Sequence, residues 1–132
     1  MADAFPNALE MREIKFGPKS SDAERVAVAK RLEEAGRLAE ALDLYLIARD
    51  EAGVARLRTR AVAEGRPILL LMLVRTGLIP ARAEWTQAAE AAMRAGRWRD
   101  AFRCFHEAAD EAGLARVKEK LPDYSLFTPQ GK

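Results

Sequence analysis

Apolar residues along this chain recur at intervals of three and four positions, the spacing that places side chains on one face of an α-helix. The clearest series is Leu38, Ala41, Leu42, Tyr45 and Ala48. The sequence lacks the alternation of apolar and polar residues that is typical of half-buried β-strands. The pattern therefore predicts an all-α fold.

Shifting the sequence by 60 places aligns two related segments. The segment that starts at Ala35, AGRLAEALDLYLIARDEAGVARL, matches the segment that starts at Ala95, AGRWRDAFRCFHEAADEAGLARV. Apolar residues exchange for apolar residues, so the match follows a packing pattern and not only the alanine-rich composition. We interpret the segments as parts of two copies of one helical unit, at residues 22–57 and 82–117.

Each copy predicts two helices joined by a tight turn, because the apolar series stops at Gly36 and at Gly96 as it does at a helix C-terminus. Between the copies we expect an atypical helical pair. Its first helix is predicted at residues 54–64, and its second, after Gly65, is apolar nearly all round and so buried on several sides.

The predicted organisation is a helical-repeat domain at residues 21–120 between an N-terminal arm at 1–20 and a C-terminal tail at 121–132. Prolines lie in both end segments, which are expected to be irregular.

The two copies resemble the tetratricopeptide repeat family, in which two antiparallel helices pack through small residues at fixed positions. The second copy carries Trp85, Ala88, Ala89, Ala92, Gly96, Trp98, Ala101, Phe105 and Ala108 at the family's spacings. The first copy carries Val28, Ala29, Leu32, Gly36, Leu38, Ala41, Tyr45 and Ala48. The resemblance implies a short α-solenoid of stacked antiparallel hairpins, with about six to seven helices in this chain.

Two features depart from the family pattern. Gly53 and Gly113 replace the proline that closes a family repeat, and the distance of 60 residues differs from the family's ~34. Coatomer-type and other helical repeats share the same alanine and glycine spacing. The sequence therefore predicts a helical-repeat protein more firmly than it predicts one particular repeat family.

Charge and cysteine content narrow the classes of protein. Lys and Arg number 22 and Asp and Glu 20, and a net charge of +2 is too small for a dedicated nucleic-acid or membrane protein. The single cysteine permits no intramolecular disulfide, which favours a reducing cytoplasm. The longest apolar run, at residues 68–74, is far shorter than the ~20 residues of a membrane span. High alanine and arginine usage is a hint of a GC-rich bacterial source.

No catalytic, metal or cofactor site is predicted. Cys104 and His106 are two residues apart on a predicted helix, about 200° around its axis, so they would not face each other as a nucleophile and a base do. The acidic pairs Asp50-Glu51 and Asp110-Glu111 occur at equivalent places in the two copies. They are interpreted as residues of which either could cap the helix that follows, rather than as paired carboxylates for catalysis. Trp85 is interpreted as a core residue, and so is Trp98, because both lie within apolar series.

In the second helix of each copy, Leu44 of the first copy corresponds to Cys104 of the second, and Leu46 to His106. The second copy is therefore expected to face water, or only a thin cover, on the side of this helix that carries Cys104 and His106.

The resemblance implies a concave surface formed by the first helix of each hairpin, which in such proteins takes a peptide or helix of a partner. Carried over to this chain, the groove face comprises Val26, Lys30, Glu33, Glu34, Thr86, Glu90, Met93 and Arg94. The predicted function is a non-catalytic adaptor or scaffold that binds another protein, with self-association as a further possibility.

Two alternatives remain open from the sequence. The first is a nucleic-acid-associated helical protein that uses a basic surface comprising Arg56, Arg58, Arg60, Arg66 and Arg75, although these residues more simply form a solvated face. The second is a structural component that assembles with copies of itself through its end faces.

Overall fold

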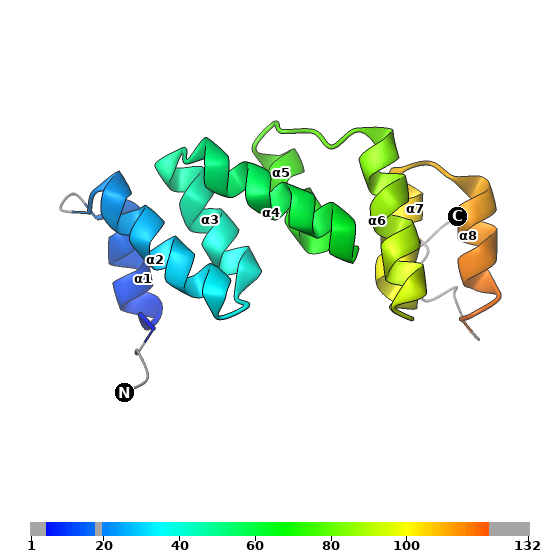
Figure 1. The fold of residues 1–132 in the computed structure, drawn as a ribbon, viewed down its shortest axis with the longest axis horizontal. Coiled ribbons are helices and arrows are strands. Elements are labelled where there is room, and N and C mark those ends of the chain that lie inside the picture. The colour runs from blue at the N-terminus through cyan, green and yellow to red at the C-terminus, as the bar shows by residue number, and fades with distance from the viewer. Residues whose placement is uncertain (1–4, 18–19, 122–132) are drawn as a thin grey trace, which may run out of the picture. The chain divides into compact units, whose positions relative to one another are not determined.

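The protein is represented by a computed structural model that describes residues 5–17 and 20–121. These residues form eight α-helices and no strand, so the predicted all-α fold is confirmed. The helices are α1 Ala8–Phe16, α2 Asp22–Glu34, α3 Leu38–Ala48, α4 Glu51–Glu64, α5 Pro67–Arg75, α6 Arg82–Arg94, α7 Trp98–Glu107 and α8 Glu111–Lys118 (Figure 1). Most of the predicted tail at 121–132 lies outside the described residues.

The prediction of six to seven helices was too low, because α1 lies in the arm that was expected to be irregular. A capping box begins this helix: the Asn7 side chain accepts a hydrogen bond from the Glu10 backbone N–H at 2.8 Å, and the Glu10 carboxylate accepts one from the Asn7 N–H at 3.0 Å. Of its apolar side chains, Met11 is buried, whereas Leu9 is 77% and Phe16 70% exposed. Local capping therefore supports a helix that has no continuous apolar stripe.

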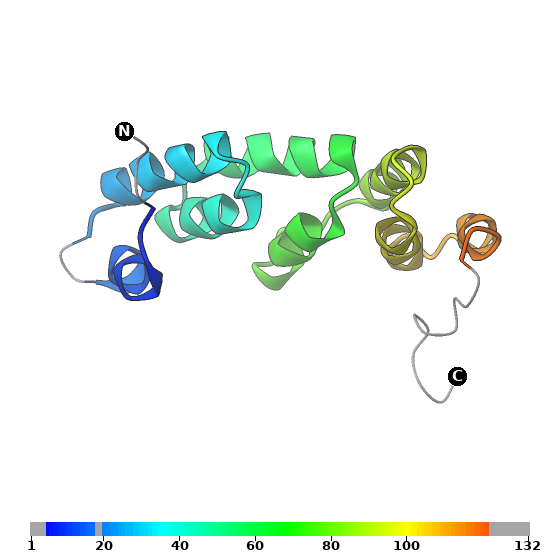
Figure 2. The same ribbon diagram turned by 90° about the horizontal axis from the view of Figure 1, so that it is seen from below.

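Two compact units divide the chain, Met1–Leu57 and Arg58–Lys132, and the boundary between them falls within α4. In the first unit α2 and α3 form an antiparallel hairpin (Figure 2). The C-terminus of α1 is fastened to this hairpin by Arg25, whose Nε donates to the Ile14 carbonyl at 2.9 Å, and by an ion pair between Lys15 and Asp43.

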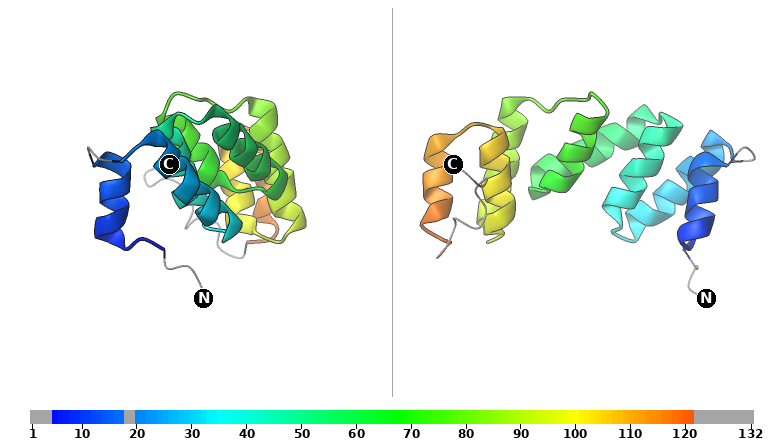
Figure 3. Two further views of the ribbon diagram at one scale, coloured as in Figure 1. Left: turned by 60° about the vertical axis from the view of Figure 1, so that its left-hand side comes forward. Right: turned by 180° about the vertical axis from the view of Figure 1, so that it is seen from behind.

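The second unit contains α5, the α6–α7 hairpin and α8 (Figure 3). Alanines occupy buried positions of the hairpin: Ala88, Ala92 and Ala101 are fully buried, as Ala41 is in the α2–α3 hairpin. Small side chains allow two helix backbones to approach closely, which is why these positions carry alanine in both hairpins.

Three turns share one backbone conformation. Gly36, Gly65 and Gly96 follow α2, α4 and α6 with φ of +81°, +69° and +74°. The backbone N–H of the next residue, an arginine in each turn, donates to a carbonyl five residues earlier at 2.9 Å. This is the left-handed helix ending that glycine adopts most readily. The turn between α4 and α5 thus matches the turns of the two aligned copies.

Gly53 and Gly113 have a different role, because they lie inside the first turns of α4 and α8. A Cβ atom at Gly53 would overlap the ring of Tyr45, and a Cβ at Gly113 would overlap the ring of Phe105. Each glycine therefore lets an aromatic ring of the preceding helix lie against the backbone. This contact explains why glycine stands where the resembled family has proline.

Burial differs from expectation at two places. In α5, Leu69, Leu70 and Leu73 are buried, but Ile68 is 62% exposed, so one side of this helix is open. On the flank of the second copy that was expected to face water or only a thin cover, Cys104 has no exposed surface, whereas His106 is exposed. Sulfur behaves as a small apolar group at this position.

Candidate functional site

The predicted groove residues fall on one face of each of two helices. Val26, Lys30, Glu33 and Glu34 lie on α2 in the first unit, and Thr86, Glu90, Met93 and Arg94 lie on α6 in the second. On α2, Lys30 and Glu34 are exposed, and on α6 Arg94 is exposed; the other five are half-buried.

Two of these residues are already held within the fold. The Glu33 carboxylate accepts hydrogen bonds from Arg56 at 3.0 Å and from the Tyr45 hydroxyl at 2.7 Å. Desolvation, followed by the hydrogen bond to Glu33, raises the pKa of Tyr45 to about 12. Glu90 accepts two hydrogen bonds from Arg116, at 2.6 and 3.0 Å, and this contact lowers the Glu90 pKa.

Arg56 and Arg116 occupy aligned positions of the two copies, and each guanidinium also lies over the aligned aromatic ring, 5.5 Å from Tyr45 and 5.7 Å from Phe105. Paired charges and stacked rings of this kind fix the helices to each other. We therefore interpret Glu33 and Glu90 as structural residues, each within its own unit.

The arginines of the predicted basic surface are largely neutralised. Arg58 forms a two-pronged contact with Glu84 at 2.8 and 2.6 Å, which lowers the Glu84 pKa. Arg66 contacts Glu64 at 2.8 Å, and Arg60 contacts it at 2.7 Å. Both hydrogen bonds lower the pKa of Glu64, and the effect of Arg66 is the larger. With Arg56 on Glu33, four of the five arginines of this surface have a carboxylate partner.

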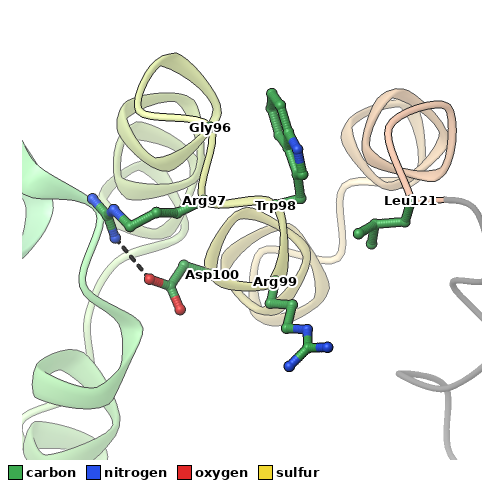
Figure 4. A pocket seen from close by; sticks show the side chains of 6 residues that line it. All are labelled: Gly96, Arg97, Trp98, Arg99, Asp100 and Leu121. Carbon is green, nitrogen blue, oxygen red and sulfur yellow. Dashed lines mark hydrogen bonds and ion pairs between the residues drawn. The ribbon is translucent and has the colours of Figure 1, made fainter.

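The two tryptophans differ in burial. Trp85 is 4% exposed, as expected of a core residue. Trp98 is only half-buried and lines a hollow of about 360 Å³ with Leu121, Arg97 and Asp100. Figure 4 shows Arg97 and Asp100 turned towards each other on one side of α7 and Trp98 on the other side, towards the chain that carries Leu121.

A second hollow, of about 500 Å³ and open to solvent, lies beside Arg97 at the C-terminal ends of α4 and α6. We call it the arginine hollow, and its lining residues are Ala63, Glu64, Arg66, Ala91, Arg94, Ala95 and Arg97. All of them belong to the second unit. Only Arg94 was predicted as a groove residue, and Arg66 was predicted only as part of the basic surface.

The turn at Gly65 brings the end of α4 close to α6. A Cβ atom at Gly65 would lie within 2.6 Å of the Ala88 carbonyl oxygen and the Ala92 nitrogen, so only glycine permits this approach. Arg97 holds the contact by donating to the carbonyl oxygens of Glu64 and Gly65, the latter at 2.7 Å. These carbonyls at a helix end have no partner within the helix, so the guanidinium satisfies them and opposes the negative end of the helix dipole.

The arginines of the hollow are held to different degrees. Arg97 also donates to the Asp100 carboxylate at 2.7 Å and is fully engaged in the fold. Arg66 contacts Glu64 through Nε alone. Within residues 5–17 and 20–121, no hydrogen bond or ion pair holds the Arg94 guanidinium. Arg94 is therefore the arginine of the hollow that is most available to a ligand.

Sequence reasoning missed the convergence at Arg97. A usable signal was present, since a glycine–arginine pair occurs at 36–37, 65–66 and 96–97. Comparing the spacing of these pairs, rather than only the two most similar segments, identifies the third turn.

The acidic residues and the cysteine that were considered for chemistry occupy structural positions. Asp50 and Asp110 accept hydrogen bonds from the backbone N–H groups of Gly53 and Gly113, at 3.3 and 3.0 Å, so their interpretation as helix caps is confirmed. Cys104 is buried and His106 exposed, and burial raises the pKa of the Cys104 thiol to about 12. No group of three or more potential metal ligands occurs in the part of the chain that the structure describes.

Helices long and apolar enough to cross a membrane are not found among the described residues. Comparisons of the chain with protein-family models, curated proteins and solved structures give no significant match.

Proposed function

We propose that this protein is a non-catalytic interaction module that binds a peptide or helix of a partner protein, and that the arginine hollow is its principal contact site. In this proposal the helical hairpins are units of a short tetratricopeptide-like solenoid. The module acts as an adaptor or scaffold in a bacterial cytoplasm.

The observation that carries the proposal is the makeup of the hollow. It combines an exposed arginine with three alanine side chains, and its size of about 500 Å³ suits one or two side chains of a partner. Alanines leave room for a partner's backbone to come close, and guanidinium groups supply directed hydrogen bonds. A site of this kind recognises a segment of polypeptide.

The nucleic-acid alternative has weaker support. Affinity for nucleic acid depends on several phosphate contacts, and four of the five arginines of the basic surface are paired with Glu33, Glu64 or Glu84. Their positive charge is thus largely compensated within the protein.

Site-specific photo-crosslinking in the native cell tests the proposal. A photoreactive p-benzoylphenylalanine replaces Ala95, which lines the hollow, or Ala115, an exposed alanine on α8 that serves as the matched control. We expect a discrete protein crosslink from position 95 that position 115 does not give. Crosslinks of equal strength from both positions, or crosslinks only to nucleic acid, would contradict the proposal.

A further inference from the structure

Resting on the function proposed above, we infer the chemistry of the partner: the arginine hollow binds a polypeptide segment through the side-chain carboxylate of an Asp or Glu, with an apolar residue of the same segment on the alanines.

Three guanidinium groups line the hollow against one carboxylate, that of Glu64. Around them, Arg60 adds a positive charge next to Glu64 and Asp100 adds a negative charge next to Arg97. The C-terminal ends of α4 and α6 each add roughly half a negative charge. About one positive charge is left over, which matches a single carboxylate and is too little for a polyanion.

The surplus charge is located at Arg94. Arg97 uses its donors on Glu64, Gly65 and Asp100, and Arg66 shares Glu64 with Arg60. Arg94 has no hydrogen bond or ion pair among the described residues, and its side chain is exposed at the last position of α6. It interacts through space with Glu90, but Arg116 already holds that carboxylate with two hydrogen bonds, so this pair adds no net charge. A carboxylate is the ligand that best matches the planar fork of a guanidinium.

Alanines complete the site. Ala63 comes from α4, and Ala91 and Ala95 come from the end of α6, so the lining between the arginines is apolar and shallow. An apolar side chain of the partner gains contact there without a deep pocket. The recognised segment therefore carries an acidic residue close to an apolar one.

The chain itself offers a matched variant. Glu34 of α2 aligns with Arg94 of α6, and each is the last residue of its helix, before Ala35 and Ala95. A glutamate at this position is thus compatible with the hairpin, so Arg94→Glu should fold. Arg82→Glu, at the exposed first position of the same helix, changes the net charge equally about 18 Å away along the helix axis.

The experiment selects binders for the full chain from a phage-displayed library of random peptides whose C-termini are blocked. The best peptide is then synthesised, and its affinity is measured by fluorescence anisotropy against the wild type, Arg94→Glu and Arg82→Glu, with circular dichroism melts of all three proteins. We expect selected peptides to share an acidic residue near an apolar one. Arg94→Glu should weaken binding about tenfold or more, and Arg82→Glu should leave it unchanged.

A second arm replaces the acidic residue of the peptide by its amide, which should weaken binding to the wild type but not to Arg94→Glu. Selected peptides without acidic residues, or equal binding by Arg94→Glu and wild type, would each overturn the inference. Neither of these results would contradict a specific protein crosslink from position 95, so the function proposed above would still stand. A loss of crosslinking specificity at Ala95 would instead remove both.

Discussion

Glycine residues in the turns after α2 and α4 share a left-handed backbone but differ in the space around them. No atom lies within 4 Å of a Cβ built at Gly36, whereas one built at Gly65 would meet the backbone of Ala88 and Ala92. The first glycine is needed only for its φ angle, and the second is needed also for the approach of α4 to α6. The same residue type therefore has different tolerance to substitution at the two turns.

Gly65→Ala is expected to destabilise the protein more than Gly36→Ala. The left-handed conformation costs an alanine about 1–2 kcal/mol at either turn, and overpacking against α6 adds about 1–3 kcal/mol at Gly65 alone. Urea unfolding of the two variants measures the difference. Equal losses of stability would mean that α4 and α6 do not approach closely at this turn.

At the scale of single helices, the sequence predicted those elements whose apolar residues form a continuous stripe. The α2–α3 and α6–α7 hairpins were found because their alanines and aromatic residues recur at helical spacing up to Gly36 and Gly96. Helix α1 was missed, since its stability depends on the capping box and on contacts with Arg25 and Asp43 rather than on such a stripe. A stripe pattern cannot predict side-chain contacts that form only when distant residues meet.

The cap of α1 can be tested directly. Asn7→Ala removes the acceptor for the Glu10 N–H, and loss of such a cap costs about 1 kcal/mol. Because α1 lies at the edge of the first unit, we expect faster amide hydrogen exchange within Ala8–Phe16 and unchanged exchange within α6. Asn7→Asp, which keeps an accepting oxygen, is the control and should exchange like the wild type. A uniform change across the chain would contradict the local role of the cap.

At the scale of the whole molecule, the candidate site was only partly predictable. Arg94 was among the predicted residues because the resemblance to tetratricopeptide repeats implied a groove face on the first helix of each hairpin. The position of Arg66 and Arg97 in the same hollow as Arg94 was not predicted. It depends on the turn at Gly65, which brings the end of α4 close to α6. The eight residues of the groove face were all predicted to bind the partner. In the structure, Glu33 and Glu90 pair with arginines that are distant in sequence, so we interpret these two glutamates as structural.

Ion pairs within and between helices make the second unit sensitive to acid. Arginine contacts lower the pKa values of Glu64, Glu84 and Glu90 below the ordinary 4.5. The stabilisation from a carboxylate with a lowered pKa is complete above the pKa of the unfolded chain and is lost as the pH falls through the folded value. We therefore expect stability to decrease below about pH 4.5.

The variant Glu84→Gln assigns part of this effect to one pair. It should be less stable than the wild type at neutral pH, and the difference should shrink as the pH falls through the lowered pKa of Glu84, because the carboxylate that pairs with Arg58 is then progressively protonated. Urea unfolding at pH 7 and at about pH 3 gives the two differences. Arg58→Gln, which removes the partner, should reproduce the same pattern. A difference that is constant with pH would exclude the pair as its source.

The burial of Cys104 has a practical consequence for labelling the protein. Thiol reagents attack the exposed thiolate, and this only cysteine is fully buried with a pKa raised to about 12. A cysteine introduced at an exposed position such as Ala95 is therefore the sole reactive thiol of the native chain, and a dye or spin label can be attached there with Cys104 left in place. Cys104 itself becomes available to reagents only when α7 opens, so the rate of its modification reports how often that helix leaves its packed state.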